Sequence, residues 1–262
     1  MAYSTFRFEQ TGPVVRITID RPSVKNAFDD VLIVELTQAL DVIAQDDSMR
    51  VMVLTGEGDV FSAGADLNWM RKVSHYTFEQ NVEDAKIFAR MLEKLYRLPK
   101  PTIARVNGAC MGGGVGLVSA CDISLCIREA KFALREILLG IAPAAISPYV
   151  LRKIGETNAR DYFLTGRIFH AETAREIGLI NEVVDIADID LHTQRWIHYF
   201  LKAGPKAIAV TKELINRVSW ARIEDMQEYT ARTIAALRGA DEGQEGFAAF
   251  FEKRKPRWDV EG

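Results

Sequence analysis

Short apolar segments alternate with longer amphipathic ones through most of this chain, and that alternation limits its possible folds more than any other feature. Residues 6–19 alternate apolar and polar side chains around Thr11 and Gly12, which predicts a β-hairpin with one buried face. Residues 29–45 carry apolar side chains at helical spacing, and the wholly apolar residues 51–54 predict a strand. The same signals predict a helix over 77–96, strands over 102–106 and 123–127, and a short helix after Gly114. Strands that alternate with helices indicate the α/β class.

The last third of the sequence has a different character. From about residue 171 onward, amphipathic helices follow one another, separated by Gly178, by Gly204-Pro205 and by residues 239–243. Only residues 180–184 suggest a strand in this part. We therefore place a boundary near Asp190, with residues 1–190 as the core and residues 191–262 as a C-terminal helical region.

The composition is that of a folded globular protein. Its 262 residues are 48% hydrophobic and 26% charged, which argues against a disordered or fibrous chain. The net charge of −3 gives no general attraction for nucleic acid or anionic lipid, so we expect no nucleic-acid partner. The first residues lack the order of a secretory signal, and three cysteines without a CxxC pair encode neither a disulfide framework nor a zinc site. We therefore expect a cytoplasmic protein without a bound metal.

Residues 108–127 have about the length and low charge of a transmembrane helix. The stretch nevertheless contains Asp122 and four glycines, at positions 112, 113, 114 and 116. This composition predicts a buried turn and the start of a helix inside a large core. We expect no association with a membrane.

Two segments suit chemistry on a bound ligand through their backbone amides. The first is Phe61-Ser62-Ala63-Gly64-Ala65-Asp66-Leu67, whose small side chains let a ligand approach the backbone. Its structural alternative is a tight loop in which Asp66 caps the following helix. The second, residues 107–117, places a glycine cluster before a short helix, where unsatisfied N–H groups at the positive end of the helix dipole stabilise a developing anion. Its spacing is neither GxxxxGKS/T nor the dinucleotide pattern GxGxxG, so nucleotide binding by those routes is not predicted.

A third segment surrounds Glu136, which lies among apolar residues. Burial would raise the pKa of this carboxyl toward the working pH and suit it to proton transfer. The alternative is an ion pair with Arg135 or a place on the surface of a helix. The four histidines lack metal-ligand spacing, and no Gly-x-Ser-x-Gly motif is present, so the sequence predicts no metal or covalent catalysis.

In their order and spacing these segments resemble the enoyl-CoA hydratase/isomerase family, also called the crotonase family. The likeness covers nearly the whole chain. It comprises Asp20-Arg21-Pro22, Asn26-Ala27-Phe28, residues 62–66, the glycines 112–114, Cys121-Asp122-Ile123, Glu136, and Phe250-Phe251-Glu252-Lys253-Arg254-Lys255. The resemblance implies an α/β fold made of a spiral of ββα units, with a C-terminal helical region for trimerisation and trimers that pair into hexamers.

The resemblance also implies a set of site residues. The N–H groups of Ala63 and Gly113 would form an oxyanion hole for the thioester carbonyl of an acyl-CoA, a site in which removing one donor commonly costs about 10²–10³ in rate. The backbone of Ala63, Gly64, Ala65 and Asp66 would receive the adenine end of coenzyme A. Lys253 and Phe250 would contact the coenzyme A nucleotide from a neighbouring subunit, and Lys25 is a further phosphate candidate. No cofactor is implied, because the coenzyme A thioester is the substrate.

Departures from the family pattern bear on the activity. Some hydratases of the family have two glutamates, the first 20 residues before the second. In this chain Glu136 corresponds to the second glutamate, and Gly116 stands where the first would be. Dienoyl-CoA isomerases of the family use an aspartate eight residues beyond, where this chain has Ala144. A single carboxylate at position 136 admits two enzymes. A Δ3,Δ2-enoyl-CoA isomerase would shuttle a proton between C2 and C4, and a hydratase would activate water for attack at C3.

Residues 140–150 and 113–117 look most like those of bacterial methylglutaconyl-CoA hydratases of leucine and isoprenoid breakdown, so we favour hydration of such a substrate. Gly116 in place of a glutamate removes a negative charge and is expected to open space for a 3-methyl branch or a second carboxylate. Arg135, Arg71 or Lys72 would pair with that distal carboxylate. The alternative from another class is a non-catalytic protein that binds acyl-CoA or RNA on the same fold.

Overall fold

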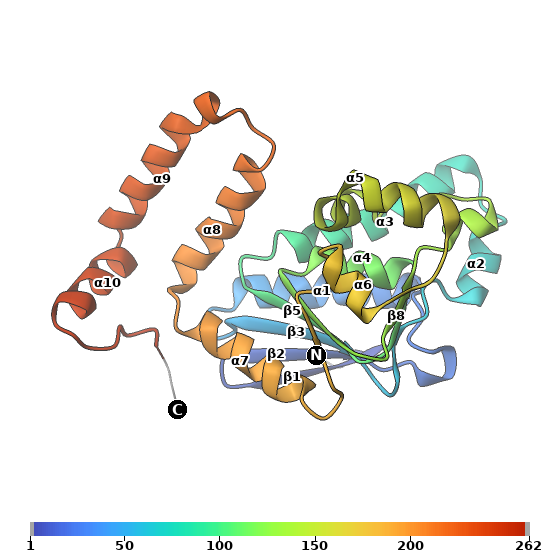
Figure 1. Ribbon diagram of the computed structural model, residues 1–262, viewed down its shortest axis with the longest axis horizontal. Helices are drawn as coiled ribbons and strands as arrows, with labels where there is room; N and C mark the ends of the chain where they lie inside the picture. The colour runs from blue at the N-terminus through green and yellow to red at the C-terminus, as the bar shows by residue number, and fades with distance from the viewer. Residues whose placement is uncertain (1–2, 260–262) are drawn as a thin grey trace.

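The computed structural model describes residues 3–259, which form two β-sheets surrounded by helices (Figure 1). The larger sheet has the order β1-β2-β3-β5-β7-β10. Its strands are β1 (Phe6–Thr11), β2 (Val14–Ile19), β3 (Val51–Gly56), β5 (Thr102–Val106), β7 (Ile123–Ile127) and β10 (Glu182–Val184). β1 and β2 form the predicted antiparallel hairpin, and the remaining pairs are parallel. The α/β class is thereby confirmed.

The smaller sheet has the order β4-β6-β8-β9 and contains strands of two or three residues. These are β4 (Val60–Ser62), β6 (Ala109–Met111), β8 (Lys131–Ala133) and β9 (Phe169–His170). The sequence did not predict them, because two or three residues are too few to show an alternating pattern. They carry the candidate loops, since β4 leads into residues 63–66 and β6 leads into the glycine cluster.

Helices cover the large sheet on both faces. They are α1 (Asp30–Gln45), α2 (Leu67–Val73), α3 (Phe78–Tyr96), α4 (Gly113–Ala120), α5 (Ser147–Thr165), α6 (Ala171–Glu176), α7 (Ile189–Leu201), α8 (Pro205–Val218), α9 (Gln227–Gly239) and α10 (Asp241–Phe251). Short 3-10 helices occur at Pro22–Val24 (η1), Glu136–Leu139 (η2) and Ile223–Met226 (η3). The expectations for α1, α3 and α4 are confirmed, whereas α5 was not predicted.

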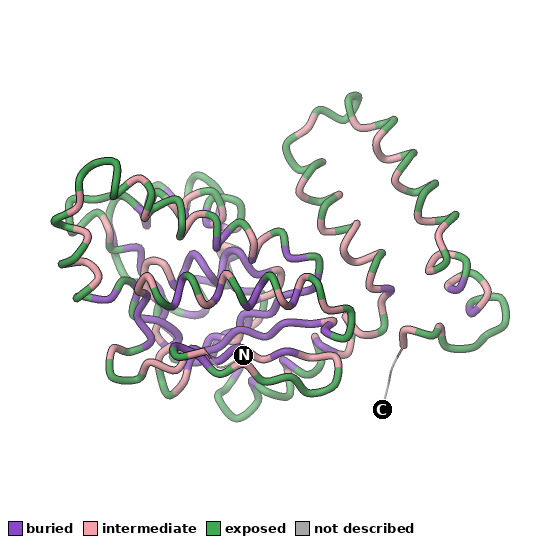
Figure 2. The backbone as a smooth tube through the Cα atoms, turned by 180° about the vertical axis from the view of Figure 1, so that it is seen from behind, coloured by how far each residue is buried: buried purple, intermediate pink, exposed green. Residues whose placement is uncertain are grey.

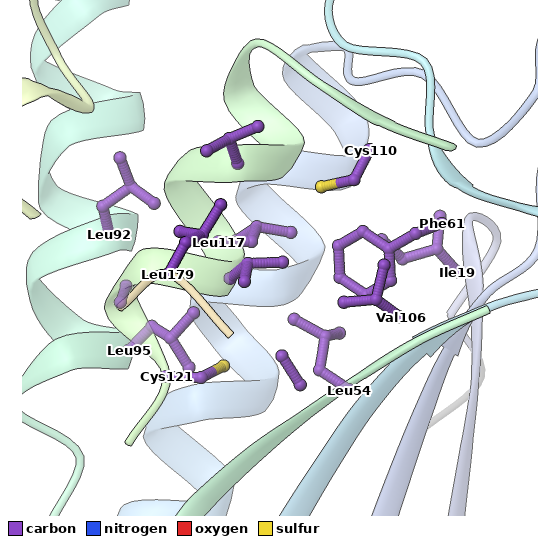
Figure 3. Close-up of a cluster of buried hydrophobic side chains, with 14 of the residues drawn as sticks. Ile19, Leu54, Phe61, Leu92, Leu95, Val106, Cys110, Leu117, Cys121 and Leu179 are labelled. Atoms are coloured by element: carbon purple, nitrogen blue, oxygen red, sulfur yellow. The ribbon is translucent and has the colours of Figure 1, made fainter. Parts of the chain in front are cut away.

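The main core lies between the sheets and helices α1, α3, α4 and α5. Figure 3 shows Leu117 of α4 among side chains from its neighbours, with Leu92 and Leu95 of α3 on one side and Phe61 and Leu54 on the other. Seven of the eight residues of α4 are buried, which explains its apolar sequence. The apolar stretch that could have spanned a membrane is therefore a central helix flanked by strands β6 and β7. The part of the chain that the structure describes contains no helix long and apolar enough to cross a membrane.

Helix α7 packs on the other face of the large sheet. Ile197 joins Val51, Val53, Ile103 and Leu125 in a second, smaller core. Asp190, where we placed a boundary, lies in the first turn of α7 and forms an ion pair with Arg105 of β5, with Nε and Oδ1 2.8 Å apart. The helices that pack on the large sheet therefore end with α7, and the helices that project from it begin after Gly204.

Helices α8 to α10 project from this body as an arm (Figures 1 and 2). α8 and α9 contain no buried residue, and α10 contains only Glu245 and Ala249. One contact that ties the arm to the body is Lys212 of α8, whose Nζ lies 2.6 Å from Asp122 Oδ2. Gly204 precedes α8 as predicted, and α9 ends at Gly239 and α10 begins at Asp241, within the break predicted over residues 239–243.

Candidate active site

The candidate active site begins at the N-terminus of α4, directly after β6. Gly112 adopts φ 49°, a backbone conformation that favours glycine, and its N–H donates to the Ala133 carbonyl at 2.8 Å. This turn sends the chain into α4, whose first N–H group belongs to Gly113. Among the described residues the Gly113 N–H has no acceptor, as expected for the first residue of a helix. It is available to an oxygen atom of a ligand, at the positive end of a helix dipole.

The second candidate loop lies beside the first because β4 pairs with β6, with Ser62 opposite Cys110. Two hydrogen bonds fix this loop on the segment that contains Phe28. The Phe28 N–H donates to Gly64 O, and the Asp66 N–H donates to Phe28 O, both at 2.7 Å. The N–H of Ala65, between these two bonds, has no acceptor in the described part of the chain. Because Phe28 also packs at Gly113, the free amides of both loops belong to one site.

The assignment of the oxyanion donor to Ala63 is therefore wrong. The Ala63 N–H donates to the Lys25 carbonyl at 3.0 Å, so it is committed to the fold. Ala65, two residues later, has the free N–H and an exposed position. The sequence pattern could not distinguish the two alanines, since which amide points outward depends on the bridge to Phe28.

The side chain of Asp66 has a structural task, as the alternative interpretation anticipated. Asp66 Oδ1 accepts from the Asn68 N–H at 2.7 Å and caps α2. Its Oδ2 lies 3.4 Å from Arg21 Nη2, and the same guanidinium contacts Asp29 at 2.5 Å. Asp66 is buried, so its carboxylate helps to hold Ala65 in place and leaves the backbone for any ligand contact.

Two buried asparagines hold the strand that leads to this loop. Asn26 donates from Nδ2 to the carbonyls of Glu57 and Val60 at 2.9 and 2.7 Å. Asn107 donates to the Gly58 carbonyl at 2.8 Å. Both side chains therefore hold the turn before β4 in place. The two asparagines lie in segments named in the sequence analysis, but only the structure shows this positioning role.

Glu136 begins the short helix η2, and its carboxyl faces the glycine turn. Oε1 lies 3.0 Å from the position that a Cβ would occupy at Gly112, so any larger residue there would displace the carboxyl. Oε2 is buried and has no hydrogen-bond partner in residues 3–259. Burial is the largest influence on the pKa of Glu136 and raises it above its ordinary value. The alternative of an ion pair with Arg135 is wrong, because Glu136 Oε2 has no partner among the described residues and Arg135 does not contribute to the shift in the pKa of Glu136.

Gly116 does not open space beside Glu136, which corrects the expectation from sequence. A Cβ at Gly116 would lie 2.3 Å from Cγ2 of Ile146 and 2.9 Å from its Cβ. Ile146 is 2% exposed and immediately precedes α5. The room that the missing side chain leaves is therefore filled by Ile146, a residue that the sequence did not single out.

The remaining walls near α4 are apolar. A Cβ at Gly113 would meet Phe88 at 3.2 Å and Phe28 at 3.3 Å, and these two rings lie 5.8 Å apart. Leu92 lies 3.8 Å from the Cβ position of Gly116. The first turn of α4 thus has a free amide, the Glu136 carboxyl and these apolar side chains beside it, while Ser62 and Cys110 lie against Gly114. Such a site can bind a developing oxyanion beside a base in a weakly solvated setting.

The basic candidates lie in different places. Lys25 is exposed, with φ 54°, near the loop that contains Ala63. Arg135 is exposed next to Glu136, whereas Arg71 contacts Asn68 at 3.3 Å and Lys72 forms an ion pair with Asp30 at 2.5 Å. Lys72 is therefore already paired with a carboxylate of its own chain, whereas the Arg135 side chain has no partner within the described residues.

Phe250 and Lys253 lie at the end of the arm. Phe250 is 78% exposed, and Lys253, with φ 55°, follows the end of α10. The arm holds them away from α2 and α4 in the same chain (Figure 1). No group of three or more metal-ligating side chains occurs within residues 3–259.

This chain is similar to known proteins in both sequence and fold. The family model described as Enoyl-CoA hydratase/isomerase matches residues 9–261. An enoyl-CoA hydratase structure from Shewanella pealeana is 40% identical, with a TM-score of 0.95, and the match covers 98% of this chain and 96% of that one. The structure of Pseudomonas aeruginosa AtuE is 33% identical, with a TM-score of 0.94 and coverages of 98% and 100%. An enoyl-CoA hydratase/isomerase from Marinobacter aquaeolei is 32% identical, with a TM-score of 0.93 and coverages of 97% and 99%.

Proposed function

Because this chain belongs to the enoyl-CoA hydratase/isomerase family, we propose that it adds water across the C2=C3 double bond of an enoyl-CoA thioester. The observation that carries the proposal is that the free amides of Ala65 and Gly113 both adjoin Phe28, and that the carboxyl of Glu136, buried and without a partner at Oε2, faces the neighbouring Gly112. The name of the Shewanella pealeana relative supports hydration as the reaction.

The mechanism follows from the positions of these groups. The Glu136 carboxylate takes a proton from water while the water oxygen bonds to C3. The electrons of the C2=C3 bond move toward the thioester oxygen, and the enolate so formed accepts hydrogen bonds from Ala65 and Gly113. The protonated Glu136 then returns a proton to C2. One carboxyl serves both steps, and a raised pKa suits it to donate as well as to accept.

We further propose a 3-methylglutaconyl-type substrate, a branched dicarboxylate monothioester. Two observations support it. No acidic side chain stands at position 116 to repel a second carboxylate, and Arg135 is exposed beside Glu136. Room at Gly116 is no longer part of the argument, since Ile146 fills it. The Arg135→Met variant should lose the preference for methylglutaconyl-CoA over crotonyl-CoA, and an unchanged preference would remove Arg135 from this role.

Isomerisation is the second candidate, and a specific observation favours it. The position from which a second carboxyl would act is occupied by Ile146, so Glu136 alone can move protons. In a Δ3,Δ2-isomerase Glu136 would remove a proton from C2, and the dienolate would take that proton back at C4. The chemistry needs the same two amide donors.

Parallel assays with 3-methylglutaconyl-CoA, crotonyl-CoA and 3-hexenoyl-CoA, read by absorbance and mass, separate these functions. The mass of one water gained with methylglutaconyl-CoA supports the proposed hydratase. A shifted double bond in 3-hexenoyl-CoA without a mass change supports the isomerase. Acyl-CoA binding without turnover supports the non-catalytic alternative and contradicts both enzymes, and RNA binding would show a steep dependence on salt.

We also propose that the active form is a trimer or a hexamer. The arm exposes large apolar side chains at both of its ends, Trp220 and Ile223 between α8 and α9 and Phe250 and Phe251 at the end of α10, and exposed apolar surface of this kind marks sites of association. A neighbouring copy would cover them and would receive Phe250 and Lys253 at its coenzyme A site. No cofactor is required for the proposed chemistry, and we propose a cytoplasmic location.

A further inference from the structure

We propose that Ile146 is a positioning residue for Glu136. Its side chain lies against Gly116, where it excludes the side chain of a second carboxylic acid, and it keeps one side of the Glu136 carboxyl apolar. The inference deepens the proposed function and rests on Glu136 as the base. It concerns why one carboxyl suffices in this site.

Ile146 and Glu136 each lie against a glycine at the start of α4. The Gly116 N–H donates to the Gly112 carbonyl at 3.3 Å, so the two glycines lie one helical turn apart. Glu136 Oε1 lies against Gly112 at 3.0 Å, and Ile146 Cγ2 would lie 2.3 Å from a Cβ at Gly116. The two side chains therefore lie against residues one helical turn apart at the start of α4.

Steric exclusion is the first consequence. A Cβ within 2.3 Å of a methyl carbon and 2.9 Å of the Ile146 Cβ cannot be accommodated without movement of one element. Ile146 is buried at the start of α5, so it has little freedom to move. Every side chain at position 116 is thus excluded while Ile146 remains, a proton-donating carboxyl among them.

The electrostatic setting of Glu136 is the second consequence. α4, which packs at Gly112, has no ionisable side chain. The ionisable groups of α5 that follow Ile146 in sequence begin with Tyr149, Arg152 and Lys153, and Arg152 contacts the Tyr96 hydroxyl at 2.9 Å. At the other end of α5, where Gly166 adjoins Ile137 and Leu138 of η2, Arg167 is paired with Asp161. Arg135, on the segment of Glu136 itself, is exposed. No charged group contributes to the shift in the pKa of Glu136, which burial dominates. A polar side chain in place of Ile146 would therefore change the main cause of that shift.

The decisive variant is Ile146→Thr, with Ile154→Thr as the matched control. Ile154 is a buried isoleucine within α5, eight residues after Ile146. The ionisation of Glu136 is followed by carboxyl infrared difference spectroscopy against Glu136→Gln, without any substrate. Ile146→Thr should lower the pKa of Glu136 by about 0.5–1 unit, a fraction of what complete burial can cause, and Ile154→Thr should leave it unchanged. Equal values in all three proteins would overturn the inference.

Catalysis gives a second readout. The acidic limb of the kcat/KM profile should move to lower pH in Ile146→Thr and stay in place in Ile154→Thr. Should Ile146→Thr fold poorly, Ile146→Ala replaces it, with the same direction expected because water gains access to the carboxyl. If no enoyl-CoA is turned over by the wild-type protein, the proposed function fails, while the infrared titration still tests Ile146.

Steric exclusion has its own test in thermal unfolding. Gly116→Ala should lower Tm in the wild-type background and lower it less in an Ile146→Gly background, because both close contacts are then gone. Equal losses in the two backgrounds would show that Ile146 does not exclude side chains at position 116.

Discussion

At the scale of single residues, the chemistry depends on Glu136, a carboxyl whose Oε2 is buried without a partner. We predict that Glu136→Gln lowers turnover of the preferred enoyl-CoA by at least about 10²-fold, the usual contribution of a positioned acid or base. Binding should persist, because the free amides of Ala65 and Gly113 are untouched. Steady-state kinetics and calorimetric titration with a saturated acyl-CoA measure both quantities. Glu129→Gln, at an exposed position, is the control, and normal turnover in Glu136→Gln would refute the role of the base.

The raised pKa of Glu136 also predicts how stability depends on pH. A carboxyl with a folded-state pKa above its unfolded value binds protons more tightly in the folded protein, so its ionisation destabilises the fold as pH rises through this interval. Glu136→Gln should therefore have a higher Tm than the wild-type protein at pH 8. At a pH below both values, where the carboxyl is neutral in both states, the difference should vanish. A Tm gap that is the same at both pH values would contradict burial as the cause.

At the scale of elements, the site depends on how β4, the loop 63–66 and α2 are joined. Asp66 caps α2 and pairs with Arg21, so Asp66→Ala should cost about 1–2 kcal/mol of stability, the usual cost of a lost N-cap. It should also lower kcat by misplacing the Ala65 amide. Asp66→Asn keeps an oxygen that can cap the helix and should recover most of the stability, as denaturant unfolding would show. If Asp66→Ala raised KM alone and left stability intact, the carboxylate would have a direct role in binding coenzyme A.

At the scale of the whole molecule, each site is expected to need a second copy of the chain. Phe250 and Lys253 lie at the end of the arm, away from α4 of their own chain. Mixing inactive Glu136→Gln subunits with Lys253→Ala subunits, after dissociation and reassembly, should produce sites with both residues intact. In a random equimolar mixture about a quarter of the sites should be complete. Activity that never exceeds the sum of the separate variants would show that Lys253 does not act across subunits.

Much of the fold could be predicted from the sequence, because its signals are local. Period-two alternation defined the hairpin, helical spacing defined α1 and α3, and a glycine cluster located the start of α4. The apolar surroundings of Glu136 made it a candidate, whereas the role of Gly113 followed from the family resemblance, and the roles of both residues in the reaction stay predictions. α5 was missed although it has 19 residues, and it contains a non-helical glycine, Gly155, with φ 71°. The short strands of the second sheet gave no signal at all.

Tertiary structure alone decided three properties of the site. Whether Ala63 or Ala65 presents a free N–H depends on a bridge to Phe28, 37 residues earlier than Ala65 in the sequence. Whether Gly116 opens a space depends on Ile146, which a different helix brings against it. Whether Glu136 is paired or isolated depends on which side chains surround it after folding. Residue identity and spacing fix local conformation and the available functional groups, but hydrogen-bond direction, free volume and desolvation arise from contacts between segments distant in sequence.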